Sequence, residues 1–522
     1  MIYRYKTEPY EHQRRETEYQ IKWLCSGKAY GALLMGIGSG KTKTAIDIAT
    51  YLYDQGRIDS VLLVAPNGIQ NQWADTQIPL HSAETTATLV WNNSKSKKFR
   101  KEFNDFLEDF RFRWLCVNVD RFSSLENKEV LAKFIRYVKN NKTLIILDES
   151  TTIKNPSSTR SKVLCSLGEM AEYRYILTGS AVTNSPFDLY AQIEFLRKGF
   201  WNTSYFMFKK RYGLMVSEDR YDRPLSAKEM LIINTCLRKG MPKDEIIKRV
   251  CVQDSVVDYI DKNPGLKLPY RNIEELKKKI VPFSSIVKTE DCVDLPDAMY
   301  QEANIDMNGE QRKVYDDLVR NMMAECEGQE LEVTHKLTLL MRLQQVAGGF
   351  FPGENECTLI GKSNSKVDFI VKDLEEVGDM KCIIWSRFRA ECMELEKCLS
   401  KAYPYKIIER YDGSRTSDEK RDVVRRAQSG EVDILIMNPQ SGAMGLNLQE
   451  HFFRNYFFSN HFSLTLREQA EGRTHRMGAR RKAQFIDLVS KDTVDKKVIS
   501  ILKSKQDLSN YFKTKDLKDF VK

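Results

Sequence analysis

Short apolar runs alternate with longer amphipathic stretches through the first third of the chain. An amphipathic helical stretch over residues 1–30 precedes the first apolar run, which leads into a glycine-rich segment. Residues 42–56 then have helical spacing and end at Gly56. Strands that alternate with helices predict a parallel sheet covered by helices on both faces. The strand-like runs are residues 31–36, 61–65, 114–119, 143–147 and 175–177.

The same alternation returns in the last third of the chain, at residues 381–385, 406–410, 433–437, 455–458 and 484–489. Between the two series, residues 205–300 are charged and helical, with Pro and Gly punctuation and no series of strands. The pattern predicts an α/β fold with two parallel-sheet units joined by a helical insertion and linker. We expect the boundaries at residues 1–204, 205–300, 301–498 and, for a helical C-terminal tail, 499–522.

Composition and length agree with several lobes of a soluble protein. A chain of 522 residues predicts about three domains or lobes, and 42% apolar with 30% charged residues is an ordinary globular balance. The chain has no run of 18 apolar residues, so the sequence predicts no membrane span. The N-terminus lacks the apolar core of a secretory signal. We therefore expect an intracellular protein: cytoplasmic in a bacterium or a virus-infected cell, and nuclear only in a eukaryote.

The cysteines and the net charge add little. The 11 cysteines are scattered without a C-x-x-C pair, and Cys392 and Cys398 have no histidine nearby. Reduced thiols are therefore expected rather than a zinc site or disulfides. A net charge of +10 fits a polyanionic partner, but many basic proteins bind no nucleic acid.

The first candidate site lies where the first strand-like run meets the first helix. Glycines let backbone amides surround phosphate oxygens at the positive end of the following helix. The lysine of such a loop reaches the β- and γ-phosphates, and the hydroxyl after it can bind Mg²⁺. A chance glycine-rich turn is the alternative, since the first glycine of the usual pattern falls on Met35. The loop is Gly38-Ser39-Gly40-Lys41-Thr42.

A second candidate is the pair Asp148 and Glu149, which directly follows the fourth strand-like run. Open α/β sheets bind ligands at the carboxyl ends of their strands. There Asp148 could hold Mg²⁺ and Glu149 could activate a water molecule. A plain strand-end turn is the alternative, although the position within the same predicted sheet as Lys41 favours a catalytic pair.

A third candidate is the arginine pair of the second unit, Arg473 and Arg476, which stand three residues apart and so share one helix face. Phosphoryl transfer needs cations on the transferred group, and these can come from another domain. By itself this pattern favours a solvated basic helix, because residues 480–482 are also basic.

Together these stretches resemble the superfamily 2 helicases, and specifically the Swi/Snf-type DNA translocases. The likeness runs from about Pro9 to Val498, with the motifs in the family's order. It implies two tandem RecA-like lobes and a compact bacterial or viral member of the family. The segments that carry it are 38–42 (GSGKT), 61–73 (VLLVAPNGIQNQW), 148–162 (DESTTIKNPSSTRSK), 175–190 (YILTGSAVTNSPFDLY), 383–388 (IIWSRF), 411–421 (YDGS…R), 441–448 (SGAMGLNL) and 469–478 (QAEGRTHRMG).

The resemblance implies roles for single residues. Lys41 and Thr42 bind ATP phosphate and Mg²⁺, Asp148 is a metal ligand, and Glu149 is the catalytic base. Arg473 and Arg476 approach the γ-phosphate from the second lobe, with Arg476 as the arginine finger. Gln13 matches the element that reads the adenine edge. The positions that touch the DNA backbone in the family are Asn67, Ser386, Ser441 and Gly442.

Several positions depart from the family pattern and leave the coupling of hydrolysis to lobe movement open. The last of the motifs also loses its following glutamine. Family residues are replaced by Ser150-Thr151 (Ala-His), Ala181 (Pro), Ser459 (Asp), Phe462-Ser-Leu464 (Trp-Asn-Pro) and Ala479 (Gln).

Two further features, the tryptophans in or near the motifs and a basic run, need an interpretation. Trp73, Trp91, Trp114 and Trp385 lie in apolar patterns, so we expect them in the core rather than as base-stacking platforms. The basic run at residues 95–101 fits a phosphate contact and a solvated loop equally well.

The resemblance implies a DNA-dependent ATPase that uses ATP and Mg²⁺ to translocate on double-stranded DNA. Contacts that follow phosphates do not depend on sequence. A strand-separating DNA or RNA helicase is the alternative, as is a non-motor ATP switch that holds a protein partner such as a transcription complex. Candidate protein partners of the motor are those of replication, repair, recombination or transcription.

Overall fold

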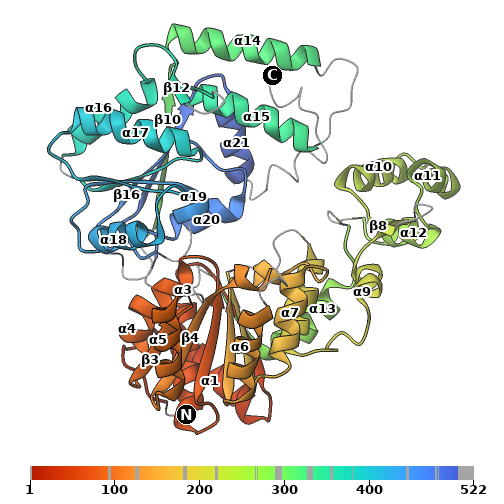
Figure 1. Ribbon diagram of the computed structural model, residues 1–522. Coiled ribbons are helices and arrows are strands. Elements are labelled where there is room, and N and C mark those ends of the chain that lie inside the picture. The colour runs from red at the N-terminus through yellow and green to blue at the C-terminus, as the bar shows by residue number, and fades with distance from the viewer. Residues whose placement is uncertain are drawn as a thin grey trace. The chain divides into compact units, whose positions relative to one another are not determined.

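The computed structural model divides the chain into two compact units, Met1–Val293 and Asp294–Lys522 (Figure 1). Each unit is built around a parallel sheet with helices packed on it, which confirms the predicted α/β class. The structure describes residues 3–91, 96–123, 128–179, 185–217, 222–264, 266, 269–288, 297–325, 333–352, 357–378, 380–442, 446–476, 479 and 481–503.

The sheet of the first unit has seven parallel strands in the order β3-β4-β2-β5-β6-β1-β9. The five predicted strands are all present, and their central members are wholly buried. This burial on both faces explains why they are continuous apolar runs. The strands are β1 (Tyr30–Met35), β2 (Ser60–Ala65), β3 (Thr86–Val90), β4 (Phe112–Asn118), β5 (Thr143–Asp148), β6 (Tyr173–Thr178) and β9 (Ser284–Val287).

Two edge strands of this sheet, β3 and β9, were not predicted. Both are short, and β9 lies in the stretch that the sequence assigned to the insertion and linker. Tertiary contacts hold β9 in place: the buried Gln20 side chain donates to the carbonyl of Phe283 (3.2 Å) and to the hydroxyl of Ser285 (3.1 Å). The first sheet therefore includes a strand, β9, that follows the inserted segment in the chain.

Helices cover both faces of this sheet. On one face, apolar side chains from the strands and helices form a continuous cluster, in which the Trp91 ring meets Phe99, Phe103 and Phe134 edge-on. The helices are α1 (Glu11–Cys25), α2 (Lys41–Asp54), α3 (Ile69–Gln72), α4 (Ile78–His81), α5 (Lys97–Glu108), α6 (Lys128–Lys139), α7 (Thr159–Gly168), α8 (Leu189–Leu196), α9 (Tyr205–Tyr212) and α13 (Ile273–Ile280).

The inserted segment has a small core of its own. The chain leaves α9 at Gly213 and returns at Tyr270, and these two residues form an antiparallel bridge. Between them a hairpin of β7 (Met215–Ser217) and β8 (Asp222–Pro224) packs with three helices around apolar residues such as Leu214, Ile233 and Val257. The sequence predicted the helices and not the hairpin. The helices are α10 (Ala227–Arg238), α11 (Lys243–Val250) and α12 (Asp254–Lys262).

The second unit has six parallel strands in the order β10-β17-β16-β13-β15-β14. All five predicted strands are present, and the unpredicted β10 is an edge strand whose side chains are mostly exposed. Apolar clusters fill both faces of the sheet. The strands are β10 (Met299–Ile305), β13 (Cys382–Trp385), β14 (Ile408–Tyr411), β15 (Ile434–Met437), β16 (Arg454–Phe457) and β17 (Gln484–Ser490).

A separate hairpin, β11 (Phe350–Pro352) with β12 (Cys357–Leu359), lies outside this sheet. No helix in the described parts of the chain is long and apolar enough to cross a membrane. Of the predicted tail, residues 504–522 lie outside the described residues. The helices are α14 (Gly309–Glu325), α15 (Val333–Ala347), α16 (Ser365–Val377), α17 (Arg389–Ala402), α18 (Ser417–Gln428), α19 (Pro439–Gly442), α20 (Leu464–Glu471) and α21 (Val494–Lys503).

Candidate nucleotide and DNA sites

The glycine-rich loop connects β1 to α2, as the sequence predicted. Gly38 and Gly40 have positive φ angles of 79° and 88°. A Cβ atom on Gly40 would lie 2.0 Å from Nε2 of Gln13, so only glycine fits at this position. The loop thus presents its backbone amides at the N-terminus of a 14-residue helix, which is an anion-binding arrangement.

Lys41 lies at the start of this helix. Its ammonium group donates to the carbonyls of Met35 (2.9 Å) and Gly36 (3.1 Å), on the loop itself. Met35, which replaces the usual first glycine, is the wholly buried last residue of β1. The departure from the common pattern therefore belongs to the strand and leaves the glycine-rich turn intact.

Helix α1 packs directly on the loop through two side chains. The Gln13 amide donates to the carbonyl of Ser39 (3.2 Å) and accepts from the backbone N–H of Tyr10 (3.1 Å). The His12 ring lies 2.8 Å from the same Ser39 carbonyl, and it stacks parallel to the Tyr10 ring. The sequence singled out Gln13 and missed His12, since nothing in a lone histidine on a helix marked it.

The acidic pair stands at the end of β5. The Trp73 indole N–H donates to Oδ2 of Asp148 (2.9 Å), and the backbone N–H of Glu149 donates to Oδ1 (3.0 Å). Glu149 has left-handed backbone angles, φ 51° and ψ 58°. This conformation costs energy for a residue with a Cβ atom and is common at functional sites. The arrangement orients the Asp148 carboxylate at the carboxyl edge of the sheet and places Glu149 directly after it.

Trp73 is both a core residue, as predicted, and the hydrogen-bond donor to Asp148. It is buried and packs against Trp114 with ring centroids 6.2 Å apart, which confirms its place in the core. It also begins a five-residue π-helix, Trp73–Gln77, between α3 and α4. Such π-helical turns are frequent at functional sites. A buried indole N–H needs an acceptor, and that requirement was the only sequence signal for its bond to Asp148.

Ser150, a departure from the family pattern, links the acidic pair to α8. Its buried hydroxyl donates to Oε1 of Gln192 (2.6 Å), whose amide donates to the carbonyl of Asp188 (2.8 Å). Ala181, the other departure in this region, falls in residues 180–184, which lie outside the described residues. The end of β6 approaches the loop, because a Cβ atom on Gly179 would lie 3.9 Å from the Lys41 nitrogen.

The two arginines of the second unit follow α20 (Leu464–Glu471), so the prediction that they share one helix face is wrong. They also differ in their surroundings. The guanidinium of Arg473 is mostly buried and donates to the carbonyls of Gln469 (2.8 Å) and Leu446 (3.2 Å). Arg476 is half-buried and donates to the side-chain oxygen of Asn447. Burial lowers the pKa of Arg476 to about 10, so the side chain stays charged at neutral pH.

The predicted DNA contacts are also unequal. Asn67 is exposed just after β2 and accepts from the Gln70 amide (3.4 Å). Ser441 is half-buried near the end of α19, which ends at Gly442. Ser386 is wholly buried, and its hydroxyl donates to the Glu391 carboxylate (2.6 Å). A DNA contact at each of these positions stays a prediction.

Ser459 and Phe462, two further departures, complete a network around the end of β13. The Ser459 hydroxyl donates to the same Glu391 carboxylate (2.6 Å) and accepts from the backbone N–H of Arg387 (2.8 Å). The Arg387 guanidinium lies 3.7 Å from the centre of the Phe462 ring. Burial raises the pKa of Glu391 to about 7, so this carboxyl titrates near neutrality.

A phosphate-binding loop and an acidic strand end in one parallel-sheet unit, followed by a second such unit with an arginine pair, define a two-lobed helicase-like ATPase of superfamily 2. The SNF2-related domain matches residues 12–348, and the helicase conserved C-terminal domain matches residues 365–478. The chain therefore belongs to the SNF2-related family.

Similar proteins come from bacteria and eukaryotes. YwqA of Bacillus subtilis is 21% identical over 94% of this chain and 48% of its own length. The yeast ATP-dependent helicase FUN30 is 21% identical over 94% of this chain and 45% of its own. A zebrafish SWI/SNF-related regulator of chromatin of subfamily A, containing DEAD/H box 1A, is 23% identical over 94% and 51%. The chain thus spans about half the length of these relatives.

Among solved structures, the Sulfolobus solfataricus SWI2/SNF2 ATPase core in complex with double-stranded DNA is 19% identical, with a TM-score of 0.40. The match covers 99% of this chain and 97% of that one.

Proposed function

We propose that this chain is an ATP-driven motor that translocates on double-stranded DNA and remodels or displaces DNA-bound partners. The observation that carries the proposal is the first unit's site, where Lys41, Asp148 and Glu149 lie at the carboxyl edge of one parallel sheet. Membership of the SNF2-related family supports the same activity.

In this proposal the loop amides and Lys41 bind the triphosphate, and the Gln13 amide reads the adenine edge. Lys41 exchanges its two carbonyl partners for phosphate oxygens. Thr42 and Asp148 would hold Mg²⁺, which prefers hydroxyl and carboxylate oxygens. The Asp148 carboxylate is held at the end of β5 by the Trp73 indole and the Glu149 backbone N–H, and a carboxylate oxygen is the kind of ligand that Mg²⁺ prefers. When bound, the ion would neutralise charge on the transferred phosphoryl group.

Glu149 orients and activates the attacking water as general base. Its backbone is held in place by the Asp148 carboxylate. Arg476 is the arginine finger that stabilises the γ-phosphate charge in the transition state. Arg473 has a positioning role beside it, because two backbone carbonyls already engage its guanidinium.

Asn67, Ser441 and Gly442 are proposed to contact the DNA backbone, so binding does not depend on sequence and weakens steeply as salt rises. We assign Ser386 a supporting role, because its hydroxyl is directed to Glu391 inside the fold. A protein partner in replication, repair, recombination or transcription stays a prediction.

The test compares ATPase stimulation by duplex DNA, single-stranded DNA and RNA, beside triplex-displacement and strand-separation assays. We expect long duplexes to stimulate most, a triplex-forming strand to be displaced, and a forked duplex to stay closed. Glu149→Gln should keep ATP affinity and lose turnover by about 100-fold or more, whereas Lys41→Ala should lose ATP affinity. Stronger stimulation by single strands together with fork opening would replace the translocase with a strand-separating helicase.

A further inference from the structure

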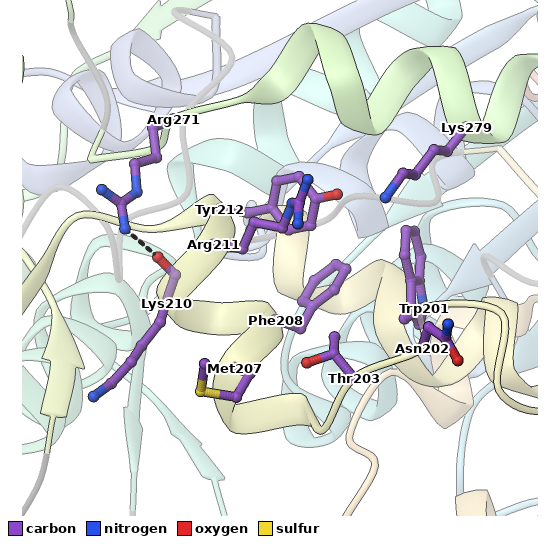
Figure 2. Close-up of a pocket in the computed structure, with 10 residues that line it drawn as sticks. All are labelled: Trp201, Asn202, Thr203, Met207, Phe208, Lys210, Arg211, Tyr212, Arg271 and Lys279. Carbon is purple, nitrogen blue, oxygen red and sulfur yellow. Dashed lines mark hydrogen bonds between the residues drawn. The ribbon is translucent and has the colours of Figure 1, made fainter.

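A cavity lies in the first unit, where the inserted segment joins the sheet. It has a volume of about 530 Å³ and opens between the turn before α9, α9 itself and α13 (Figure 2). Leu214 donates from its backbone N–H to the carbonyl of Pro269 (2.9 Å), beside the Gly213–Tyr270 bridge. The cavity therefore adjoins both crossings of the chain into the insertion. None of the motifs discussed above contributes to it.

The lining is strongly cationic. Lys210, Arg211, Arg271 and Lys279 line the cavity, and no carboxylate does. Glu275, next to them, is shared: one of its oxygens lies 2.8 Å from Arg211 and 2.9 Å from Lys279. One carboxylate thus serves two cations, and the local charge stays positive.

Arg271 brings donors that the fold does not use up. Its Nη2 donates to the carbonyl of Lys210 (2.5 Å; Figure 2), and its buried Nε has no hydrogen-bond partner among the described residues. A buried donor without a partner is costly, so an incoming oxygen near this guanidinium is stabilised. Arginine is also the side chain best suited to bidentate binding of carboxylates.

The floor and rim of the cavity are apolar. Trp201, Phe208 and Tyr212 form the floor and pack edge-on or tilted against one another as part of the core of the unit. At the rim, Met207 is 52% exposed, and its neighbour Phe206 is 46% exposed. Exposed methionine adapts to different partner side chains.

These features point away from nucleic acid. Base stacking needs an open aromatic face, but Trp201, Phe208 and Tyr212 are only 6%, 0% and 1% exposed. A duplex carries its phosphates on a convex surface, which does not fit inside a cavity. An occupant must combine carboxylates for the cations with a large apolar side chain that packs on the exposed Met207 rim.

We propose that this cavity is a docking site for an acidic peptide segment of a partner protein, with one large apolar side chain inserted between α9 and α13 and flanking carboxylates on Arg271, Lys210 and Lys279. Charge complementarity selects the segment, and the apolar insertion sets its register. This site is separate from the proposed motor function and does not depend on it.

The test measures binding of a fluorescein-labelled peptide with a central phenylalanine between two runs of glutamate to the full chain, by fluorescence anisotropy. We expect saturable, salt-sensitive binding. The variant Lys210→Ala/Lys279→Ala with Met207→Asp should lose about tenfold or more in affinity. Lys277→Ala is the matched control, because Lys277 lies on α13, pairs with Glu274 and does not line the cavity. Basal ATPase should be unchanged in all of them.

Three outcomes would overturn the proposal. One is that the peptide fails to bind or binds the triple variant as well as the wild type. Another is that a peptide with glycine in place of phenylalanine binds equally well, because binding would then depend on charge alone. The third is that a single-stranded oligonucleotide of the same charge binds more tightly and is equally weakened in the triple variant.

Discussion

Asp148 receives hydrogen bonds from two directions, one from the Trp73 indole and one from the backbone N–H of Glu149. Because Trp73 also lies on the segment that follows β2 and Asn67, the stretch proposed to touch DNA is bonded directly to the proposed magnesium ligand. At the scale of single residues, the site thus depends on a side chain that composition and periodicity assign to the core.

The first prediction is that Trp73→Phe impairs turnover while the fold survives. The change keeps a buried aromatic ring and removes the donor to a charged acceptor, a bond worth about 1.5–3 kcal/mol. We expect kcat to fall about tenfold and half-maximal activity to need more Mg²⁺.

Trp114→Phe is the control for this change. Trp114 is equally buried and packs on Trp73, but its indole N–H has no hydrogen-bond partner among the described residues. If the two variants show the same kcat and the same Mg²⁺ dependence, the bond to Asp148 has no part in catalysis.

At the scale of elements, buried polar side chains join strands and helices that the chain separates widely. Gln20 of α1 accepts from the Tyr175 hydroxyl of β6 (2.9 Å) and donates to Ser285 of β9. In the second unit, Glu391 of α17 accepts from Ser386 after β13 and from Ser459 after β16. Each of these side chains supplies a hydrogen-bond partner to a buried hydroxyl group of another element.

The second prediction concerns the pH dependence of the second unit. Burial raises the pKa of Glu391 from 4.5 to about 7, so the folded state favours the neutral carboxyl. A group whose pKa is raised on folding contributes stability below its unfolded pKa, and this contribution is lost as pH rises through the folded value. We expect the free energy of unfolding to fall by about 3 kcal/mol between pH 4.5 and 7 on account of this group.

Glu391→Gln should remove that part of the pH dependence, because a carboxamide accepts from the same hydroxyls and does not titrate. Urea unfolding followed by tryptophan fluorescence at a series of pH values measures it. The assignment is wrong if the variant and the wild type lose stability in parallel across this range.

At the scale of the whole molecule, the proposed catalytic groups are divided between two units. Lys41, Asp148 and Glu149 belong to the first, and Arg476, the proposed arginine finger, belongs to the second. A motor that assembles its site from two lobes can couple ATP binding to lobe closure and product release to reopening.

The third prediction follows from this division. Arg476→Ala should reduce DNA-stimulated turnover by about 100-fold or more while ATP affinity changes little, because an arginine finger acts on the transition state. Steady-state ATPase and nucleotide-binding measurements on the full chain test this. Arg473→Ala should instead lower the stability of the second unit, since two carbonyls lose their donor.

Lys482→Ala serves as the control for charge in the same region, because Lys482 is exposed and lies two residues before β17. If Arg476→Ala hydrolyses ATP at the rate of this control under saturating duplex DNA, Arg476 is not the arginine finger.

The amino-acid sequence by itself determined the two α/β units, because the central parallel strands, such as β2, β5, β13 and β15, are buried on both faces and so are continuous apolar runs. It also determined the glycine-rich loop and the acidic strand end, because both directly follow strands that the apolar pattern predicts. Short edge strands such as β9 carry too little apolar pattern to be recognised, and they were decided by pairing in the folded sheet. Bonds between distant segments, such as Trp73 to Asp148, His12 to the loop and Ser459 to Glu391, were likewise decided only by the tertiary structure, because each partner finds its acceptor only when separate elements pack together.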